Sequence, residues 1–196
     1  MERVLAILLL FGSGTAAGAG ILEFRDYDRP AYPEARTPFV VQLARQFGDA
    51  DTLVVGDSLV EQTDLAWACG RTFNGGIGGA RVQDVQAALP DLIEATSPET
   101  VVVAIGTNHF AAGNEMKDFR ALYPELVESL SDRELVLVGV SNSAEASAVV
   151  SRIADDIDAP YVAPVTAPLK ADGLHHTVAG SLAYRDAIVR GCSAVS

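Results

Sequence analysis

Short apolar runs alternate with amphipathic segments from residue 50 to the end of the chain. Continuous runs rich in β-branched residues are typical of strands buried on both faces of a parallel sheet. Five such strands are predicted, over residues 52–55, 72–74, 100–105, 135–139 and 160–162. Apolar residues recur at helical spacing between them. This spacing predicts helices over residues 39–47, 59–68, 80–89, 115–130, 144–157 and 177–192.

Strands that alternate with helices predict an α/β fold. We expect a three-layer α/β/α sandwich around a five-stranded parallel sheet, with a flavodoxin-like strand order. The chain has 196 residues, of which 49% are hydrophobic, and can bury one sizeable core. We therefore expect one domain over residues 51–196. Residues 20–50 are predicted to hold a leader, extended over 21–37, and the first helix.

Residues 1–19 look like a targeting segment. The apolar run Val4–Phe11 leads into small residues that include Ala17-Gly18-Ala19, a pattern typical of a signal-peptide cleavage site. Export to the periplasm or the exterior is therefore expected. An uncleaved membrane anchor is the alternative, because no charged residue lies between Val4 and Leu22.

Export gives the two cysteines a possible role, because disulfides persist in oxidising compartments. Cys69 precedes the second predicted strand and Cys192 closes the last predicted helix. A bridge between them would tie down the C-terminus, and two separate thiols are the other interpretation. The sequence leaves both open, since it does not give the Cα separation that a disulfide requires.

The chain carries an excess of acid, with 26 Asp and Glu residues against 14 Lys and Arg residues and a formal net charge of −12. Such a surface repels phosphate backbones and anionic membranes, so nucleic acid is not an expected partner. Solubility or genome composition is favoured over a functional acidic patch as the explanation of this excess.

Three short motifs lie directly after an apolar run or in a loop before a predicted helix. They are Gly56-Asp57-Ser58-Leu59, Gly106-Thr107-Asn108 and Asp172-Gly173-Leu174-His175. An open α/β sheet brings such loops to the carboxyl edge of its strands, where ligands bind in these folds.

Together these motifs supply the groups needed to hydrolyse an acyl bond. Ser58 is the candidate nucleophile, and His175 is the candidate base that removes its proton. Asp172 can accept a hydrogen bond from the other ring nitrogen and fix the tautomer. An oxyanion could be held by the Ser58 N–H, by an N–H of the glycine loop 75–79 and by the Asn108 amide.

The sequence resembles the SGNH (GDSL) hydrolase family in four blocks, in the family's order. These are the three motifs above and Asn74-Gly75-Gly76-Ile77-Gly78-Gly79. The resemblance implies a triad of Ser58, His175 and Asp172 and an oxyanion hole of Ser58, Gly79 and Asn108. The chain departs from the family at His109, where an aspartate is common, and at Ala80-Arg81. At His109 we expect altered local support or substrate contact, without loss of activity. Arg81 could contact a substrate oxygen, but a solvated arginine at the start of a helix is favoured.

Other interpretations of these motifs are weaker. A metal site would need His175, His176 and Asp172 to converge with His109, although adjacent histidines project differently. The glycine loop lacks the third glycine of a dinucleotide-binding fingerprint and follows the second strand. No metal and no cofactor are therefore expected.

The sequence thus predicts an exported serine hydrolase of esters that uses an acyl-enzyme. A short chain with no insertion large enough for a lid favours small acyl groups, such as O-acetyl groups on carbohydrate or short-chain esters. A lysophospholipase, a thioesterase and an acyltransferase fit the same site. From another class, a non-catalytic glycan- or acyl-binding module remains an alternative.

Overall fold

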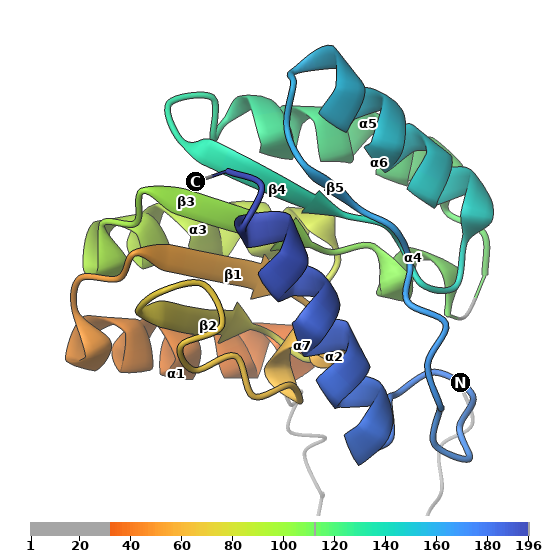
Figure 1. The fold of residues 1–196 in the computed structure, drawn as a ribbon, viewed down its shortest axis with the longest axis horizontal. Helices are drawn as coiled ribbons and strands as arrows, with labels where there is room; N and C mark the ends of the chain where they lie inside the picture. The colour runs from red at the N-terminus through yellow and green to blue at the C-terminus, as the bar shows by residue number, and fades with distance from the viewer. Residues whose placement is uncertain (1–31, 112, 196) are drawn as a thin grey trace, which may run out of the picture.

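The computed structural model describes residues 32–111 and 113–195, so the predicted targeting segment and most of the predicted leader lie outside the described residues. Figure 1 shows one sheet of parallel strands in the order β2-β1-β3-β4-β5. This order is the flavodoxin-like one, as predicted. The strands are β1 (Thr52–Gly56), β2 (Thr72–Gly76), β3 (Thr100–Ala104), β4 (Glu134–Val138) and β5 (Tyr161–Val162).

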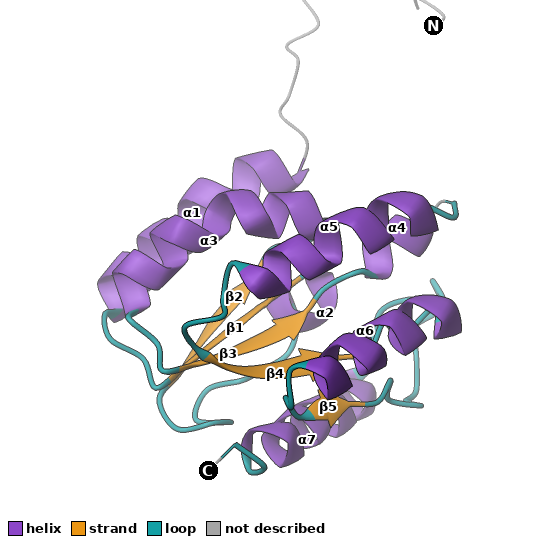
Figure 2. Ribbon diagram, turned by 90° about the horizontal axis from the view of Figure 1, so that it is seen from above, coloured by secondary structure: helices purple, strands orange, loops and turns teal. Residues whose placement is uncertain are grey.

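Helices cover both faces of the sheet, which confirms the three-layer sandwich. They are α1 (Tyr32–Phe47), α2 (Ser58–Glu61), α3 (Val82–Thr96), α4 (Thr107–Phe110), α5 (Met116–Glu128), α6 (Ala144–Asp156) and α7 (Val178–Cys192). One core packs α1, α3, α5 and α6 against the sheet, and the other packs α2 and α7. Figure 2 shows α1, α3 and α5 on the side opposite α7. Across the described ranges, no helix combines the length and the apolar character that a membrane span requires.

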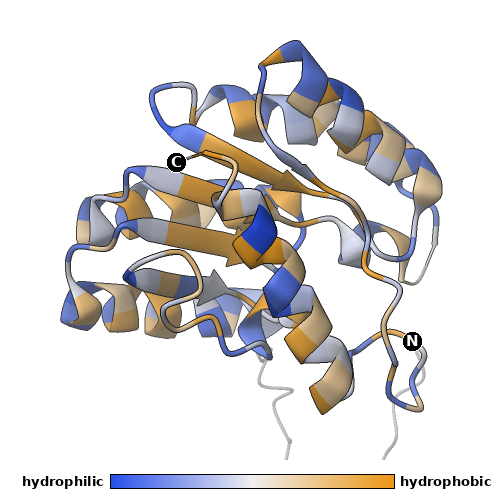
Figure 3. Ribbon diagram, in the orientation of Figure 1, coloured by the Kyte–Doolittle hydropathy of each residue, from blue (hydrophilic) through white to orange (hydrophobic). Residues whose placement is uncertain are grey.

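The central strands are hydrophobic on both faces because helices cover both (Figure 3). Every residue of β1 is buried, and Val101, Val102 and Val103 of β3 have no exposed surface. The continuous apolar runs in the sequence are therefore explained by burial on two sides.

Three helices differ from their prediction. Residues 32–37 form the first turns of α1 and are not extended. Pro33 fits a first turn, where its missing N–H costs nothing, and Val40, Val41 and Ala44 bury the helix in the core.

Helix α3 continues past Leu89 and through Pro90 to Thr96, because burial of Leu92 and Thr96 outweighs the missing N–H. Helix α2 is a single turn, and not the ten-residue helix predicted over residues 59–68. Leu65 and Ala68 are still buried, because the turns after α2 pack them into the core beside α2 and α7. In these turns Trp67 adopts a left-handed φ of 57°, which is incompatible with a continuous α-helix over residues 59–68.

Cys69 and Cys192 form a disulfide with a Cα–Cα distance of 5.9 Å, so of the two interpretations left open the bridge is correct. The bridge joins the C-terminal end of α7 to the loop that precedes β2. It lies at the opposite end of α7 from Thr177, which caps the helix by accepting a hydrogen bond from the Gly180 N–H.

Candidate functional site

The strand register places three of the four sequence blocks side by side. β1 pairs with β2 through Gly56 and Gly76, and with β3 through Gly56 and Ala104. Ser58, Gly79 and Asn108 follow these three strand ends within a few residues. The carboxyl edge of the sheet therefore carries all three loops, as the sequence predicts.

Ser58 lies at the first position of α2, directly beyond β1, and is only 8% exposed. Asp57 caps this turn, because its Oδ1 accepts a hydrogen bond from the Leu59 N–H at 3.0 Å. Asn74 ties the turn to β2: its amide donates to the carbonyls of Val60 and Thr63. The serine hydroxyl is thus held on a short, well-anchored turn.

The His175 side chain connects Ser58 to Asp172. His175 Nε2 lies 2.9 Å from Ser58 Oγ, and His175 Nδ1 lies 2.8 Å from Asp172 Oδ2. With the ring proton on Nδ1 donated to the carboxylate, Nε2 is free to accept the serine proton. The structure therefore brings together the three residues that the sequence analysis selected.

Asp172 is held within its own loop. Its Oδ1 accepts hydrogen bonds from the backbone N–H groups of Leu174 and His175, at 2.9 and 3.0 Å. Hydrogen bonds lower the pKa of the Asp172 carboxyl far below its usual value. The bond from the Leu174 amide has the largest effect, and the bonds from the His175 ring and the His175 amide follow. The Asp172 carboxylate is therefore ionised at neutral pH and gives the His175 ring an anionic partner.

A second carboxyl lies next to the nucleophile. Asp57 has no exposed surface, and burial raises the pKa of its carboxyl, opposed by the hydrogen bond from the Leu59 amide. Its role in the structure is to cap the turn that carries Ser58. The two carboxyls of the site therefore have opposite shifts in pKa, set by burial for Asp57 and by hydrogen bonds for Asp172.

The His175 loop is fastened to α2 and to α7. Lys170 Nζ donates to Gln62 Oε1 at 2.8 Å, directly after α2. Leu169 and His176 form an antiparallel bridge, and the Thr177 N–H donates to the Pro168 carbonyl. His176 turns inward, 4% exposed, and packs on Tyr184, so the two adjacent histidines do project differently.

The remaining two predicted residues lie in the loops on either side of Ser58. Gly79 adopts a φ of +74° in the turn after β2, and an added Cβ would lie 3.2 Å from Pro33. Asn108 lies in α4 and donates one amide hydrogen to the Ala80 carbonyl at 2.8 Å. Within residues 32–111 and 113–195, its second amide hydrogen has no acceptor.

The two positions that depart from the family pattern are structural supports. Arg81 precedes α3 and pairs with Glu115 at 3.0 Å. His109 is 1% exposed, and its Nε2 accepts a hydrogen bond from the Val82 N–H at 3.2 Å. His109 therefore supports the start of α3, and whether it also contacts substrate stays a prediction.

Sequence reasoning missed several of these supports. Asn74, Gln62 and Val82 hold the site loops through tertiary hydrogen bonds. Only Asn74 carried a signal, as the first residue of the glycine-rich block. Gln62 bonds through its side chain and Val82 through its backbone N–H, and the partner of each lies far away in the sequence.

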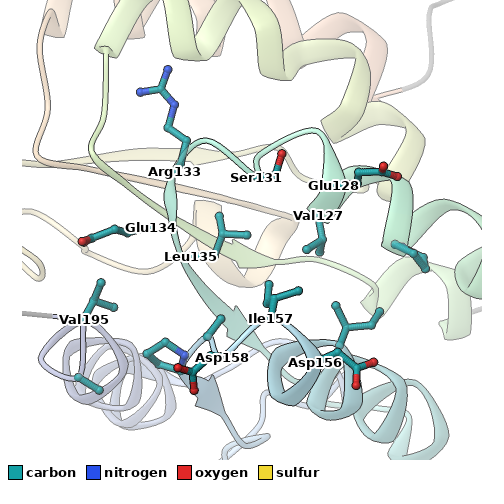
Figure 4. Close-up of a pocket in the computed structure, with 15 residues that line it drawn as sticks. Val127, Glu128, Ser131, Arg133, Glu134, Leu135, Asp156, Ile157, Asp158 and Val195 are labelled. Carbon is teal, nitrogen blue, oxygen red and sulfur yellow. The ribbon is translucent and has the colours of Figure 1, made fainter.

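In the described part of the chain, no cluster of three or more His, Cys, Asp or Glu side chains is arranged to hold a metal ion. A cavity of about 650 Å³ lies at the opposite, amino-terminal edge of the sheet (Figure 4). It is lined by the starts of β4 and β5 and by the ends of α5 and α6, and none of the site residues above contributes to it.

No protein-family model and no curated protein matches this sequence. Solved structures do match. A presumed acylhydrolase from Bacteroides fragilis has a TM-score of 0.66 at 16% identity, over 86% of this chain and 100% of that one.

Two named esterases are also similar. The psychrotrophic esterase EstA from Pseudoalteromonas sp. has a TM-score of 0.60 at 16% identity, over 74% of this chain and 97% of its own. The acetylxylan esterase Axe2 from Geobacillus stearothermophilus has a TM-score of 0.57 at 19% identity, over 74% and 95%. Identities this low establish the fold alone. The chain therefore shares with these structures a three-layer α/β/α fold around a parallel sheet.

Proposed function

We propose that the protein is a serine hydrolase that cleaves ester bonds at Ser58. The observation that carries this proposal is the hydrogen-bonded chain from Ser58 Oγ through His175 to Asp172, at 2.9 and 2.8 Å. A serine hydroxyl is a weak nucleophile until an oriented base removes its proton, and this arrangement supplies both base and orientation. The esterases with the same fold support the proposal.

The reaction follows in two halves. Ser58 Oγ attacks the ester carbonyl while His175 Nε2 takes the serine proton, and the carbonyl oxygen becomes an oxyanion. The Ser58 N–H, the Gly79 N–H and the Asn108 amide donate hydrogen bonds to it. His175 then gives its proton to the leaving alcohol, and the acyl group stays on Ser58. Water then attacks the acyl-enzyme while His175 Nε2 takes its proton. His175 gives that proton to Ser58 Oγ as the bond between the acyl carbon and Oγ breaks, and the acid is released.

A fluorophosphonate probe tests the nucleophile directly. We expect one adduct, mapped by mass spectrometry to Ser58, and we expect Ser58→Ala and His175→Ala to abolish it because each removes one half of the activated pair. Ser131→Ala, in a turn after α5, is the matched control and should label as the wild type does. A folded wild-type protein that takes up no label would favour the non-catalytic binding module.

For the substrate, we propose small acyl groups such as O-acetyl groups on carbohydrate. Two acetylxylan esterases among the solved structures with this fold support this choice. Hydrolysis of p-nitrophenyl esters from acetate to octanoate, together with acetate release from acetylated xylan, tests it. An optimum at long chains would contradict it and favour a lysophospholipase. Capture of the acyl group by an added acceptor sugar would indicate an acyltransferase.

We also propose that the protein acts outside the cytoplasm. The apolar run and small residues of residues 1–19 support this, and so does the disulfide between Cys69 and Cys192. The N-terminus of the native protein, determined by mass spectrometry, distinguishes cleavage after Ala19 from a retained anchor. A full-length protein found in the cytosol would contradict export.

A further inference from the structure

Two hydrogen bonds join the loop that contains Gly79 to the helix that contains Asn108. Asn108 Nδ2 donates to the Ala80 carbonyl at 2.8 Å, and the Val82 N–H donates to His109 Nε2 at 3.2 Å. The two bonds run in opposite directions between adjacent residues of α4 and the segment 80–82. They therefore fix both the distance and the relative rotation of the two loops.

The Val82 N–H needs an acceptor from outside its own helix. Val82 is the first residue of α3, where backbone N–H groups have no intrahelical partner, and it has no exposed surface that would let water replace one. A buried N–H without an acceptor costs about 1–3 kcal/mol. His109 supplies the acceptor from a different loop.

The surroundings of His109 keep its ring neutral. Its side chain is 1% exposed, and the Phe119 ring lies edge-on at 5.7 Å. Its Nδ1 lies 3.4 Å from Glu115 Oε2, an oxygen that also lies 3.0 Å from Arg81 Nη1 in an ion pair. Burial lowers the pKa of His109, Arg81 lowers it further, and Glu115 and Asp118 oppose this. Since Nε2 accepts a hydrogen bond, the ring proton sits on Nδ1, facing Glu115.

We propose that His109 is a positioning residue, whose neutral ring holds the Val82 N–H and thereby aligns Gly79 and Asn108 as donors to the developing oxyanion. The proposal rests on the proposed ester hydrolysis. Asn108 is adjacent to His109 in the chain, and Gly79 lies three residues before Val82, so loss of one bond loosens both donors. Donors act on the transition state only when they are aimed in advance at the charge that develops.

Two substitutions at His109 distinguish the effect of the hydrogen-bond acceptor from the effect of the aromatic ring. His109→Phe keeps an aromatic ring beside Phe119 but removes the acceptor, whereas His109→Gln offers an amide oxygen in its place. We expect kcat for an activated acetyl ester to fall about tenfold in His109→Phe, with KM within about twofold. His109→Gln should restore kcat to within about threefold of the wild type, because the bond to the Val82 N–H is restored.

Val150→Ala is the matched control for stability. Val150 is fully buried in α6, away from both loops, so its truncation lowers stability without touching the oxyanion donors. Its kcat should match the wild type under conditions where both proteins are folded. An equal loss of kcat in Val150→Ala and His109→Phe would overturn the proposal.

NMR tests the hydrogen bond without any turnover. The ¹⁵N shifts of the His109 ring should show an unprotonated Nε2 and a protonated Nδ1 at pH 7 to 8, and the Val82 amide should exchange faster in His109→Phe than in Val150→Ala. A protonated Nε2, or unchanged exchange, would overturn the proposal. A protein that takes up no fluorophosphonate and hydrolyses no ester refutes the proposed function instead, and the NMR result then decides separately whether His109 holds Val82.

Discussion

At the scale of single residues, the loop 172–175 is built to present one base. Asp172 accepts two backbone hydrogen bonds with Oδ1 and the His175 ring with Oδ2. All three donors come from residues within three positions of Asp172. The orientation of the base is therefore a local property of the loop, whereas its contact with Ser58 depends on where the loop lies.

This arrangement predicts a pH dependence of stability. The pKa of Asp172 is lowered in the folded protein, so the stability that its carboxylate contributes is fully present above the unfolded-state pKa of about 3.9. That stability is lost as the pH falls through the lowered, folded-state value. Urea unfolding of the wild type and of Asp172→Asn should therefore differ by a constant amount from pH 7 to 5, and by less at pH 3.

The effect should be modest, because solvent screens this exposed carboxylate. A difference between the two proteins at pH 3 that equals the difference at pH 7 would contradict the lowered pKa. Activity gives a second measurement: an asparagine leaves the ring tautomer unfixed, and kcat should fall by about 10³–10⁴.

At the scale of elements, helix α7 is fixed at both ends by different means. Its start is capped by Thr177, directly after the bridge between Leu169 and His176. Its end is held by the disulfide between Cys192 and Cys69, across a sequence separation of 123 residues. The half of α7 that adjoins the candidate site is thus held without the disulfide.

Reduction should therefore lower stability and spare activity. A disulfide that closes a long loop contributes about 2–4 kcal/mol, largely through the unfolded chain, so the urea midpoint should fall on reduction. Turnover at 25 °C should stay within about twofold, since hydrogen bonds hold the His175 loop. The double variant Cys69→Ser/Cys192→Ser should behave like the reduced protein and ignore reductant. Two free thiols in the unreduced, denatured wild type would contradict the bridge.

The errors in predicting elements share one cause. Apolar spacing and proline set the predicted ends of α1, α2 and α3, but packing set the real ones. Pro90 lies inside α3 because Leu92 and Thr96 are buried beyond it. Helix α2 stops after one turn because the turns that follow it bury Leu65 without a helix. Tertiary burial is worth more than local propensity in each case.

At the scale of the whole molecule, the net charge of −12 acts on any charged substrate. Asp172 adds local negative charge at the site, because hydrogen bonds lower the pKa of its carboxyl. An anionic ester should therefore meet a repulsive potential that salt screens, because the Debye length shrinks from about 30 Å at 0.01 M to about 8 Å at 0.15 M.

We expect kcat/KM for an anionic ester to rise about two- to fivefold between 10 and 200 mM NaCl. A neutral ester with the same acyl group is the control and should change little. Equal salt dependence for the two esters would show that the acid excess does not reach the site, and would leave solubility as its explanation.

The sequence by itself determined the strand order class, the layers and the identity of the candidate site residues. It could do so because buried parallel strands are continuously apolar and because Ser58, Asn108 and the 172–175 loop are each marked by short local motifs. It also determined that Asp172 and His175 could act as a pair, since three residues of one loop suffice to join them.

Only the tertiary structure decided that this pair reaches Ser58. The loop leaves β5 at one edge of the sheet and crosses past the ends of β4 and β3 to the α2 turn beyond β1, a route set by Lys170, Gln62 and the packing of α7. The tertiary structure also joined Cys69 to Cys192 and brought His109 Nε2 within hydrogen-bond distance of the Val82 N–H. These contacts link residues far apart in the sequence, and neither partner alone carries a local signal of the other.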